Sequence, residues 1–246
     1  MKYSLLYLFC LLLTECKPTN EMKNYNGKDF FVEKYYPIID AIEESNINKL
    51  ETLINDANKN IRGKNNLTFL FYSFLKNKKD VFSFFINKGV DVNQPFEKSE
   101  GDSTHIINIA AKLDDDFYFD KLVGIAKLEV KDERGLYPIH DAIMVNNNKR
   151  VLQLLAMGAN INIQDKWGQT PVYMLCDLND FEFAYDLIMR GADPKIKDTN
   201  GSSVALVIQE LSFPVTTKAY KWQQKIKEEL IKQGVTFPVK RPWEKK

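Results

Sequence analysis

The sequence predicts an all-α fold, a solenoid of about five to six helix-turn-helix repeats with hairpin loops and atypical capping repeats at its ends. The first observation behind this is a fixed period, since Asp132, Asp165 and Asp198 lie 33 residues apart and a glycine follows each of them at the same distance. The second is that each period holds two short apolar stretches of helical length. One such unit cannot bury its apolar face alone, so neighbouring units must stack.

Two segments share most of the repeated pattern. Residues 132–142 read Asp-Glu-Arg-Gly-Leu-Tyr-Pro-Ile-His-Asp-Ala, and residues 165–175 read Asp-Lys-Trp-Gly-Gln-Thr-Pro-Val-Tyr-Met-Leu. Each is followed by a second apolar stretch that closes with Gly158-Ala-Asn or Gly191-Ala-Asp. This pattern strongly resembles the ankyrin repeat, whose Asp-x-x-Gly-x-Thr-Pro-Leu-His-x-Ala motif is divided between the two copies. The resemblance implies two helices in each repeat and a hairpin loop between repeats.

The residue types within a repeat fit this interpretation. A glycine after the second helix permits the left-handed backbone that ends it. A proline in the first turn gives up an amide that has no helical partner there. The stripe expected to face a neighbouring helix is made of leucine and isoleucine. Its residues are Leu152, Leu154, Leu155, Leu187 and Ile188.

Further repeats extend in both directions from this pair. Thr68 to Ser73 begin one, with Phe69 in place of proline, and His105 to Ala110 begin a degenerate one without a closing glycine near Ala126. About ten extra residues, near 211–220, lengthen the join between the last two helices. We expect one elongated stack rather than two globular domains, because each repeat contacts only its neighbours. The expected parts are a signal peptide at 1–15, a lipidated cysteine and tether at 16–34, an N-terminal capping repeat at 35–62, ankyrin repeats at 63–197, and a C-terminal repeat with insertion and basic tail at 198–246.

The first residues have the pattern of an export signal. Lys2 precedes 5–13, an uncharged run that is too short to span a bilayer and has the length of a secretory signal core. The sequence Leu-Thr-Glu-Cys that ends at Cys16 resembles a bacterial lipobox, which implies acylation of this cysteine as the first residue of the mature protein. Glu15 departs from the small residue usual at that position. A signal peptide without lipidation, or a buried N-terminal element, therefore stays open.

Composition limits the class of ligand. The formal net charge of +1 argues against nucleic acid as the principal partner. After export and acylation, Cys176 alone would remain in the folded part, where we expect an inert packed thiol rather than a disulfide. The acidic run 114–116 lacks the glycine and spaced glutamate of a calcium loop. We expect no metal and no cofactor.

The sequence does not predict an enzyme. His140 occupies the ankyrin family's structural histidine position, which implies a hydrogen bond between neighbouring loops rather than general-base catalysis. His105 is at a helix start, where capping or packing is the simpler role. No nucleophile elbow, phosphate loop, His-Glu-x-x-His or paired-cysteine motif occurs.

In the ankyrin family the hairpin tips and the first helices form a concave surface that contacts protein partners. The resemblance places a set of expected partner-binding residues on that surface: Glu133, Arg134, Leu136, Met144, Val145, Lys166, Trp167, Gln169, Asp177, Leu178, Thr199 and Asn200. Five of them are apolar where solvent-facing residues are usual, namely Trp167, Leu136, Met144, Val145 and Leu178. A contiguous apolar patch of this kind would mark a partner site, and the alternative is that several of them pack against one another.

The leader and the repeats together resemble the periplasmic immunity lipoproteins of bacteria that carry type VI secretion phospholipase effectors. This resemblance implies a lipid-anchored periplasmic protein that neutralises a lipase-like toxin by steric occlusion. Two other interpretations share most of these features. One is a scaffold or protector of a periplasmic enzyme, and the other is a secreted ankyrin effector that binds host proteins.

Overall fold

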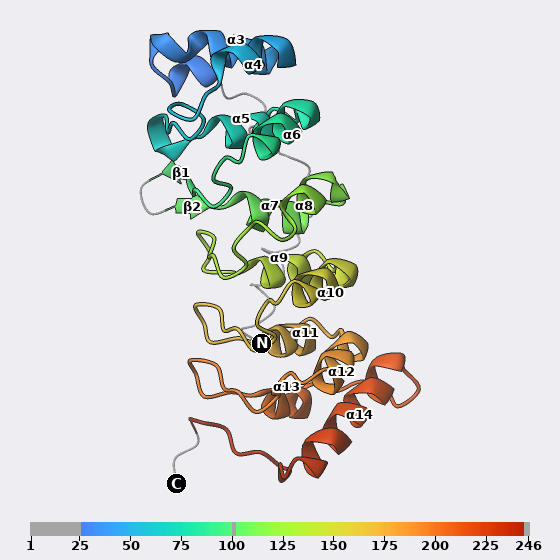
Figure 1. Cartoon of the computed structure of the whole chain (residues 1–246). Helices are drawn as coiled ribbons and strands as arrows, with labels where there is room; N and C mark the ends of the chain where they lie inside the picture. Colours follow the sequence, from blue (N-terminus) through green and yellow to red (C-terminus); the bar gives the residue numbers. More distant parts are fainter. Residues whose placement is uncertain (1–25, 100–101, 244–246) are drawn as a thin grey trace. The chain divides into compact units, whose positions relative to one another are not determined.

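The computed structural model describes residues 26–99 and 102–243. The expected signal peptide at 1–15 and Cys16 lie outside these residues. Within the described part, twelve α-helices follow one another in six pairs, with one small two-stranded sheet, so the expected all-α repeat fold is confirmed (Figure 1). The chain divides into two compact units with the boundary between Glu133 and Arg134, where the sequence led us to expect a single stack.

The first unit contains three helix pairs that stack in sequence order (Figure 1). Its helices are α3 (Tyr36–Glu43), α4 (Ile47–Leu53), α5 (Phe69–Leu75), α6 (Lys79–Asn87), α7 (Ile106–Lys112) and α8 (Asp116–Leu122). Three short 3-10 turns cover Gly27–Asp29, Glu33–Tyr35 and Lys64–Asn66. Strands β1 (Phe96–Ser99) and β2 (Asp102–Thr104) pair antiparallel in the hairpin before α7, with a shift of register between Glu97 and Ser99. The core of this unit is rich in aromatic rings, such as Phe69 stacked on Phe31 with centroids 4.7 Å apart.

The second unit contains the other three pairs. They are α9 (Pro138–Met144), α10 (Asn148–Ala156), α11 (Pro171–Asp177), α12 (Phe181–Met189), α13 (Val204–Glu210) and α14 (Lys218–Lys232). Helix α11 packs against α9, α12 and α13, and α12 packs against α14. The loops before α11 and α13 project to the same side of this unit (Figure 1).

Helix starts follow the residue types of the repeat. The hydroxyl of Thr68 accepts the amide of Phe71 at 3.1 Å, and that of Thr170 accepts the amide of Tyr173 at 3.3 Å. Each bond satisfies one of the amides that a helix N-terminus leaves without a helical partner. Helix α9 has no threonine at this position, and there the ring Nδ1 of His140 accepts the Tyr137 amide at 3.4 Å. This bond lies within the repeat of His140 itself, and the expected hydrogen bond between neighbouring loops stays a prediction.

The stripe of apolar residues is buried only in part. Leu154 and Leu187 are fully buried and Ile188 nearly so, whereas Leu152 and Leu155 are half-buried. The buried stripe of α10 runs through Arg150, Val151 and Leu154, and Leu155 and Leu152 lie next to it on one side.

A closing glycine is present in the degenerate repeat, contrary to our expectation. Gly124 has φ +78°, and it follows the C-cap residue Val123 of α8, two residues before Ala126. The repeat is shortened here, and its glycine lies earlier than the 33-residue period predicts.

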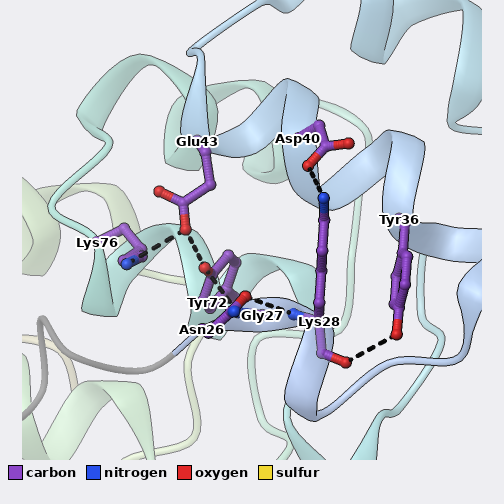
Figure 2. Close-up of polar contacts among 8 residues, drawn as sticks. All are labelled: Asn26, Gly27, Lys28, Tyr36, Asp40, Glu43, Tyr72 and Lys76. Atoms are coloured by element: carbon purple, nitrogen blue, oxygen red, sulfur yellow. Dashed lines mark hydrogen bonds and ion pairs between the residues drawn. The ribbon is translucent and has the colours of Figure 1, made fainter.

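Part of the expected tether packs on the first two helix pairs (Figure 2). Gly27 is buried, and its amide donates to the Tyr72 hydroxyl at 2.9 Å. That hydroxyl in turn donates to the Glu43 carboxylate. Lys28 pairs with Asp40 of α3 at 2.7 Å. The residues from Gly27 onward are thus part of the first unit.

The C-terminal insertion is divided between a loop and a helix. The join between α13 and α14 has seven residues, whereas that between α11 and α12 has three. Helix α14 has 15 residues, whereas α12 has nine. The expected ten extra residues therefore lengthen the join by four and the last helix by six.

Candidate partner-binding surface

The hairpin loops of the second unit are held by aspartates at the 33-residue period. Asp165 is only 5% exposed, and its Oδ1 accepts the amides of Trp167 and Gln169, both at 2.8 Å. Asp198 accepts the two amides at the corresponding positions of the next hairpin, also at 2.8 Å. The period that marks the sequence is therefore the period of a carboxylate that closes each turn.

Neighbouring hairpins touch through their backbones. The carbonyl of Trp167 accepts the amide of Thr199 at 2.9 Å. Gly168 has φ +78°, and a Cβ there would lie 2.8 Å from the Thr199 nitrogen. Only glycine tolerates both this backbone conformation and this approach. The contact fixes the spacing of the two hairpin tips.

Trp167 is the exposed aromatic residue of these tips. Its side chain is 44% exposed, while its amide and carbonyl both make the bonds described above. The Nζ of Lys166 lies 4.4 Å from the centroid of the indole ring. A large aromatic side chain on a fixed backbone loses little entropy on binding, which is the property of an interface anchor.

The other four apolar residues of the expected set are less exposed than Trp167. Leu136 is buried at 3% exposure, because the residue after the hairpin glycine turns inward, where burial removes its side chain from water. Met144, Val145 and Leu178 are half-buried. The alternative of packing within the fold therefore holds for Leu136, and the role of the other three stays a prediction.

The polar members of the expected set have different surroundings. Lys166, Asp177, Thr199 and Asn200 are exposed, whereas Gln169 is half-buried. Desolvation by its surroundings raises the pKa of the Asp177 carboxyl.

Two charged members of the set lie at the boundary between the units. Arg134 pairs with the fully buried carboxylate of Asp141, so its guanidinium also has a structural role. Glu133 is half-buried and is the last residue of the first unit.

Further basic residues lie in the second unit that were not among the expected partner-binding residues. Lys195 and Lys197 are exposed, and Arg241 is exposed while it pairs with Glu210 at 2.7 Å. Their signal was weak, because single lysines in loops are common on any surface. Of the basic residues on this side, Lys166 lies directly over the tryptophan ring.

The side chains considered for catalysis are placed in structural roles. Cys176 is fully buried, and burial raises the pKa of its thiol well above the ordinary range. His105 occupies the N-cap position of α7, where burial lowers its pKa. It does not line the surface hollow beside Phe84 or the one beside Tyr220. Across residues 26–99 and 102–243, no group of three or more histidine, cysteine or carboxylate side chains is arranged to hold a metal, and no helix has the length and apolar character to cross a membrane.

Comparison with known proteins supports the repeat assignment. A family model of the ankyrin repeat matches residues 134–166. The crystal structure of the ankyrin repeat domain of Bcl-3, a member of the IkappaB family, superposes with a TM-score of 0.62 over 84% of this chain and 89% of that one, at 18% identity. The fold is that of an ankyrin-repeat protein. A crystal structure of the ankyrin repeat protein EF0377 is also similar, with a TM-score of 0.59, 18% identity, and 78% of this chain and 96% of that one covered.

No curated protein sequence matches the chain. The two ankyrin structures are too distant in sequence to carry more than the fold.

Proposed function

We propose that this ankyrin module is exported to the periplasm, is held at a membrane by a lipid on Cys16, and captures a cognate secreted toxin of the lipase-like class. Support for the compartment comes from the apolar run at 5–13 and the cysteine that follows it. Support for capture comes from the ankyrin fold. The protein does no chemistry in this proposal, and it acts by covering the toxin.

The single observation that best supports this position of the binding site is the geometry of Trp167. Its ring is exposed while its backbone is fixed on both sides by hydrogen bonds to Asp165 and Thr199. Tryptophan is among the residues that most often dominate interface energy, because it excludes much water and has few rotatable bonds. The residue thus combines exposure, rigidity and the right chemical type.

The charge around this tryptophan indicates what the toxin must present. Lys166 and Lys197 are exposed, whereas the carboxylates of Asp165 and Asp198 are used within the turns. The hairpin tips therefore offer an aromatic ring beside exposed lysine side chains. A complementary partner has an apolar pocket rimmed by acidic side chains.

The mechanism is steric. A protein that docks on the hairpin tips and first helices of the second unit brings a broad face of this module over its own surface. If that face holds the entrance to a lipase active site, or the side by which the lipase reaches lipid, substrate is excluded while the complex lasts. Protection then depends on the lifetime of the complex and on no catalytic residue of this chain.

The test begins with affinity capture from the native bacterium and mass spectrometry of the bound proteins. With the captured toxin in hand, Trp167→Ala should weaken binding by about 2 kcal/mol or more, which is about 30-fold in Kd. Met189→Ala is the matched control, because Met189 is a large apolar side chain of the same unit that is 60% exposed on α12.

The Met189 variant should bind as the parent does, and both variants should unfold at the parent's urea concentration. In bacteria challenged with the toxin, the Trp167 variant should lose protection at expression levels where the control still protects. A Trp167 variant that binds within threefold of the parent would place the interface elsewhere.

A further inference from the structure

The charge of this chain is concentrated at its C-terminal end. The whole sequence carries a formal charge of +1, yet residues 211–246 hold nine lysines and arginines against three glutamates. This segment alone therefore carries +6, and the rest of the chain is acidic overall. Such asymmetry is typical of a basic surface with an anionic ligand.

Helix α14 arranges part of this charge on one face. Its buried side consists of Gln223, Ile226 and Leu230, which pack toward the unit. Four lysines lie on the outward side at spacings of three, four and seven residues, which keep them on one face of a helix. They are Lys218, Lys221, Lys225 and Lys232, and all four are exposed. We call them the lysine stripe.

Two lysines of the stripe form ion pairs with glutamates, yet their side chains stay largely exposed to solvent. Lys218 pairs with Glu182 of α12 while its side chain stays 75% exposed, and Lys232 reaches Glu229 at 3.4 Å with 70% exposure. Glu228 is also exposed on this helix. The stripe nevertheless remains net positive.

Apolar and aromatic groups border the stripe. The Nζ of Lys225 lies 3.7 Å from the centroid of the Trp222 ring, and this ring lies 5.5 Å from that of Tyr185 on α12. Met189, one helical turn beyond Tyr185, and Ile231 on α14 are both large exposed apolar side chains. Lysine stems beside aromatic rings and isolated apolar side chains are the components of a helix that lies at a lipid interface.

We infer that the lysine stripe and its apolar border dock on an anionic membrane surface, with α14 parallel to that surface. The charge complementarity is with lipid phosphates, each lysine near such a surface contributing about 1 kcal/mol. A protein partner is the weaker match, because protein interfaces are depleted in lysine and enriched in arginine, and α14 contains no arginine. Helix α14 lies on the side of the second unit away from the hairpin loops, so the toxin surface proposed above stays free (Figure 1).

The test measures binding of the whole chain to vesicles. The chain carries Cys16→Ser in every sample, so that no acyl chain contributes. Co-sedimentation is compared between vesicles of phosphatidylcholine and vesicles of equal parts phosphatidylcholine and phosphatidylglycerol. The inference predicts stronger binding to the mixed vesicles and a loss of that difference in high salt, since exposed charges are screened.

Charge reversal identifies the surface. Lys221→Glu, Lys225→Glu and Lys232→Glu together should lower the affinity for mixed vesicles by about 100-fold or more, at about fivefold for each lysine lost. The matched control reverses three exposed lysines of the same unit on its hairpin side, Lys166, Lys195 and Lys197, which gives the same change in net charge. The control should stay within threefold of the parent. Glutamine at the three stripe positions keeps the test valid if the glutamate variant does not fold.

Equal binding to the two kinds of vesicle would overturn the inference, and so would an equal loss in the two charge variants. A stripe variant that binds vesicles normally but no longer captures a protein would show that α14 is a protein interface. The inference does not depend on the toxin proposal, because the vesicle assay contains no other protein.

Discussion

Two glycines of the second unit share a left-handed backbone but differ in their surroundings. Gly158 has φ +93°, and no atom lies within 4 Å of the point that a Cβ would occupy, whereas a Cβ at Gly168 would meet the backbone of Thr199. The first glycine is required for conformation alone. The second is required for conformation and for the approach of the next hairpin.

Alanine at these two positions should therefore have different costs. Gly158→Ala should lower the free energy of unfolding by about 1 to 2 kcal/mol, the usual cost of a left-handed residue with a Cβ. Gly168→Ala should cost more, because Thr199 must also shift. Urea unfolding of the two variants checks this difference. Equal losses would mean that the hairpins do not meet as the structure places them.

Buried hydroxyl and thiol groups predict a loss of stability at alkaline pH. Burial raises the pKa of Cys176 from 9.0, and it raises the pKa of Tyr118 from 10.0, with nearby Asp115 adding to the effect. The unfolded chain gives up these protons at lower pH than the folded chain does. The free energy of unfolding should thus hold below about pH 9 and fall above it.

Tyr118→Phe tests the contribution of Tyr118 to this loss of stability at alkaline pH. This variant loses the hydrogen bond from the tyrosine hydroxyl to Asn77, which is 2.8 Å long, and should be less stable than the parent at neutral pH. Between about pH 9 and pH 11 its stability should fall less steeply, because one titrating group is gone. Parallel curves for parent and variant would show that Tyr118 titrates normally.

At the scale of single helices, the burial of each leucine determines how much stability its replacement should cost. Leu154→Ala and Leu187→Ala should each cost about 2 to 5 kcal/mol through lost burial and a cavity, since both side chains are fully buried. Leu155→Ala should cost less, because Leu155 is half-buried. Lys166→Ala should change little. Comparable shifts for Leu154 and Lys166 in thermal unfolding would contradict the placement of these helices.

The regular parts of the repeats could be predicted from sequence because their turns and helix starts are determined by residues close by in the chain. The aspartate closes a turn, the glycine permits a left-handed backbone, and threonine or proline starts a helix within the next few residues. Each of these signals acts over a handful of positions. The pairs from α9 to α12 therefore lie where the period places them.

Features that depend on distant residues could not be predicted in the same way. The residues from Gly27 onward pack on the first unit because of Tyr72, which lies 45 residues away in sequence. Arg150 is fully buried in α10, at the position that a phenylalanine occupies 33 residues later. Leu136 looked exposed by its place in the motif, yet the turn carries its side chain inward. In each case the sequence names the residue but does not indicate which distant residues pack over it.

At the scale of the whole molecule, the attachment to a membrane is open to a direct test. Cys16→Ser should release the protein into the soluble fraction of the periplasm, because several acyl chains hold a protein firmly whereas none remains in the variant. Cys10→Ser is the control, since Cys10 lies within the apolar run of the expected signal and would be removed with it. Equal membrane retention of the Cys16 variant and the parent in cell fractionation would remove the lipid anchor from the proposed function.

The division into two compact units also determines which part of the molecule a fluorescence experiment observes. All three tryptophans, Trp167, Trp222 and Trp243, belong to the second unit, whereas the first unit has its phenylalanine and tyrosine rings and no tryptophan. Indole emission excited at long wavelength therefore reports on the second unit alone. Unfolding of the first unit would be visible only through circular dichroism or tyrosine absorbance. A mismatch between those signals during denaturation would measure how far the two stacks unfold independently.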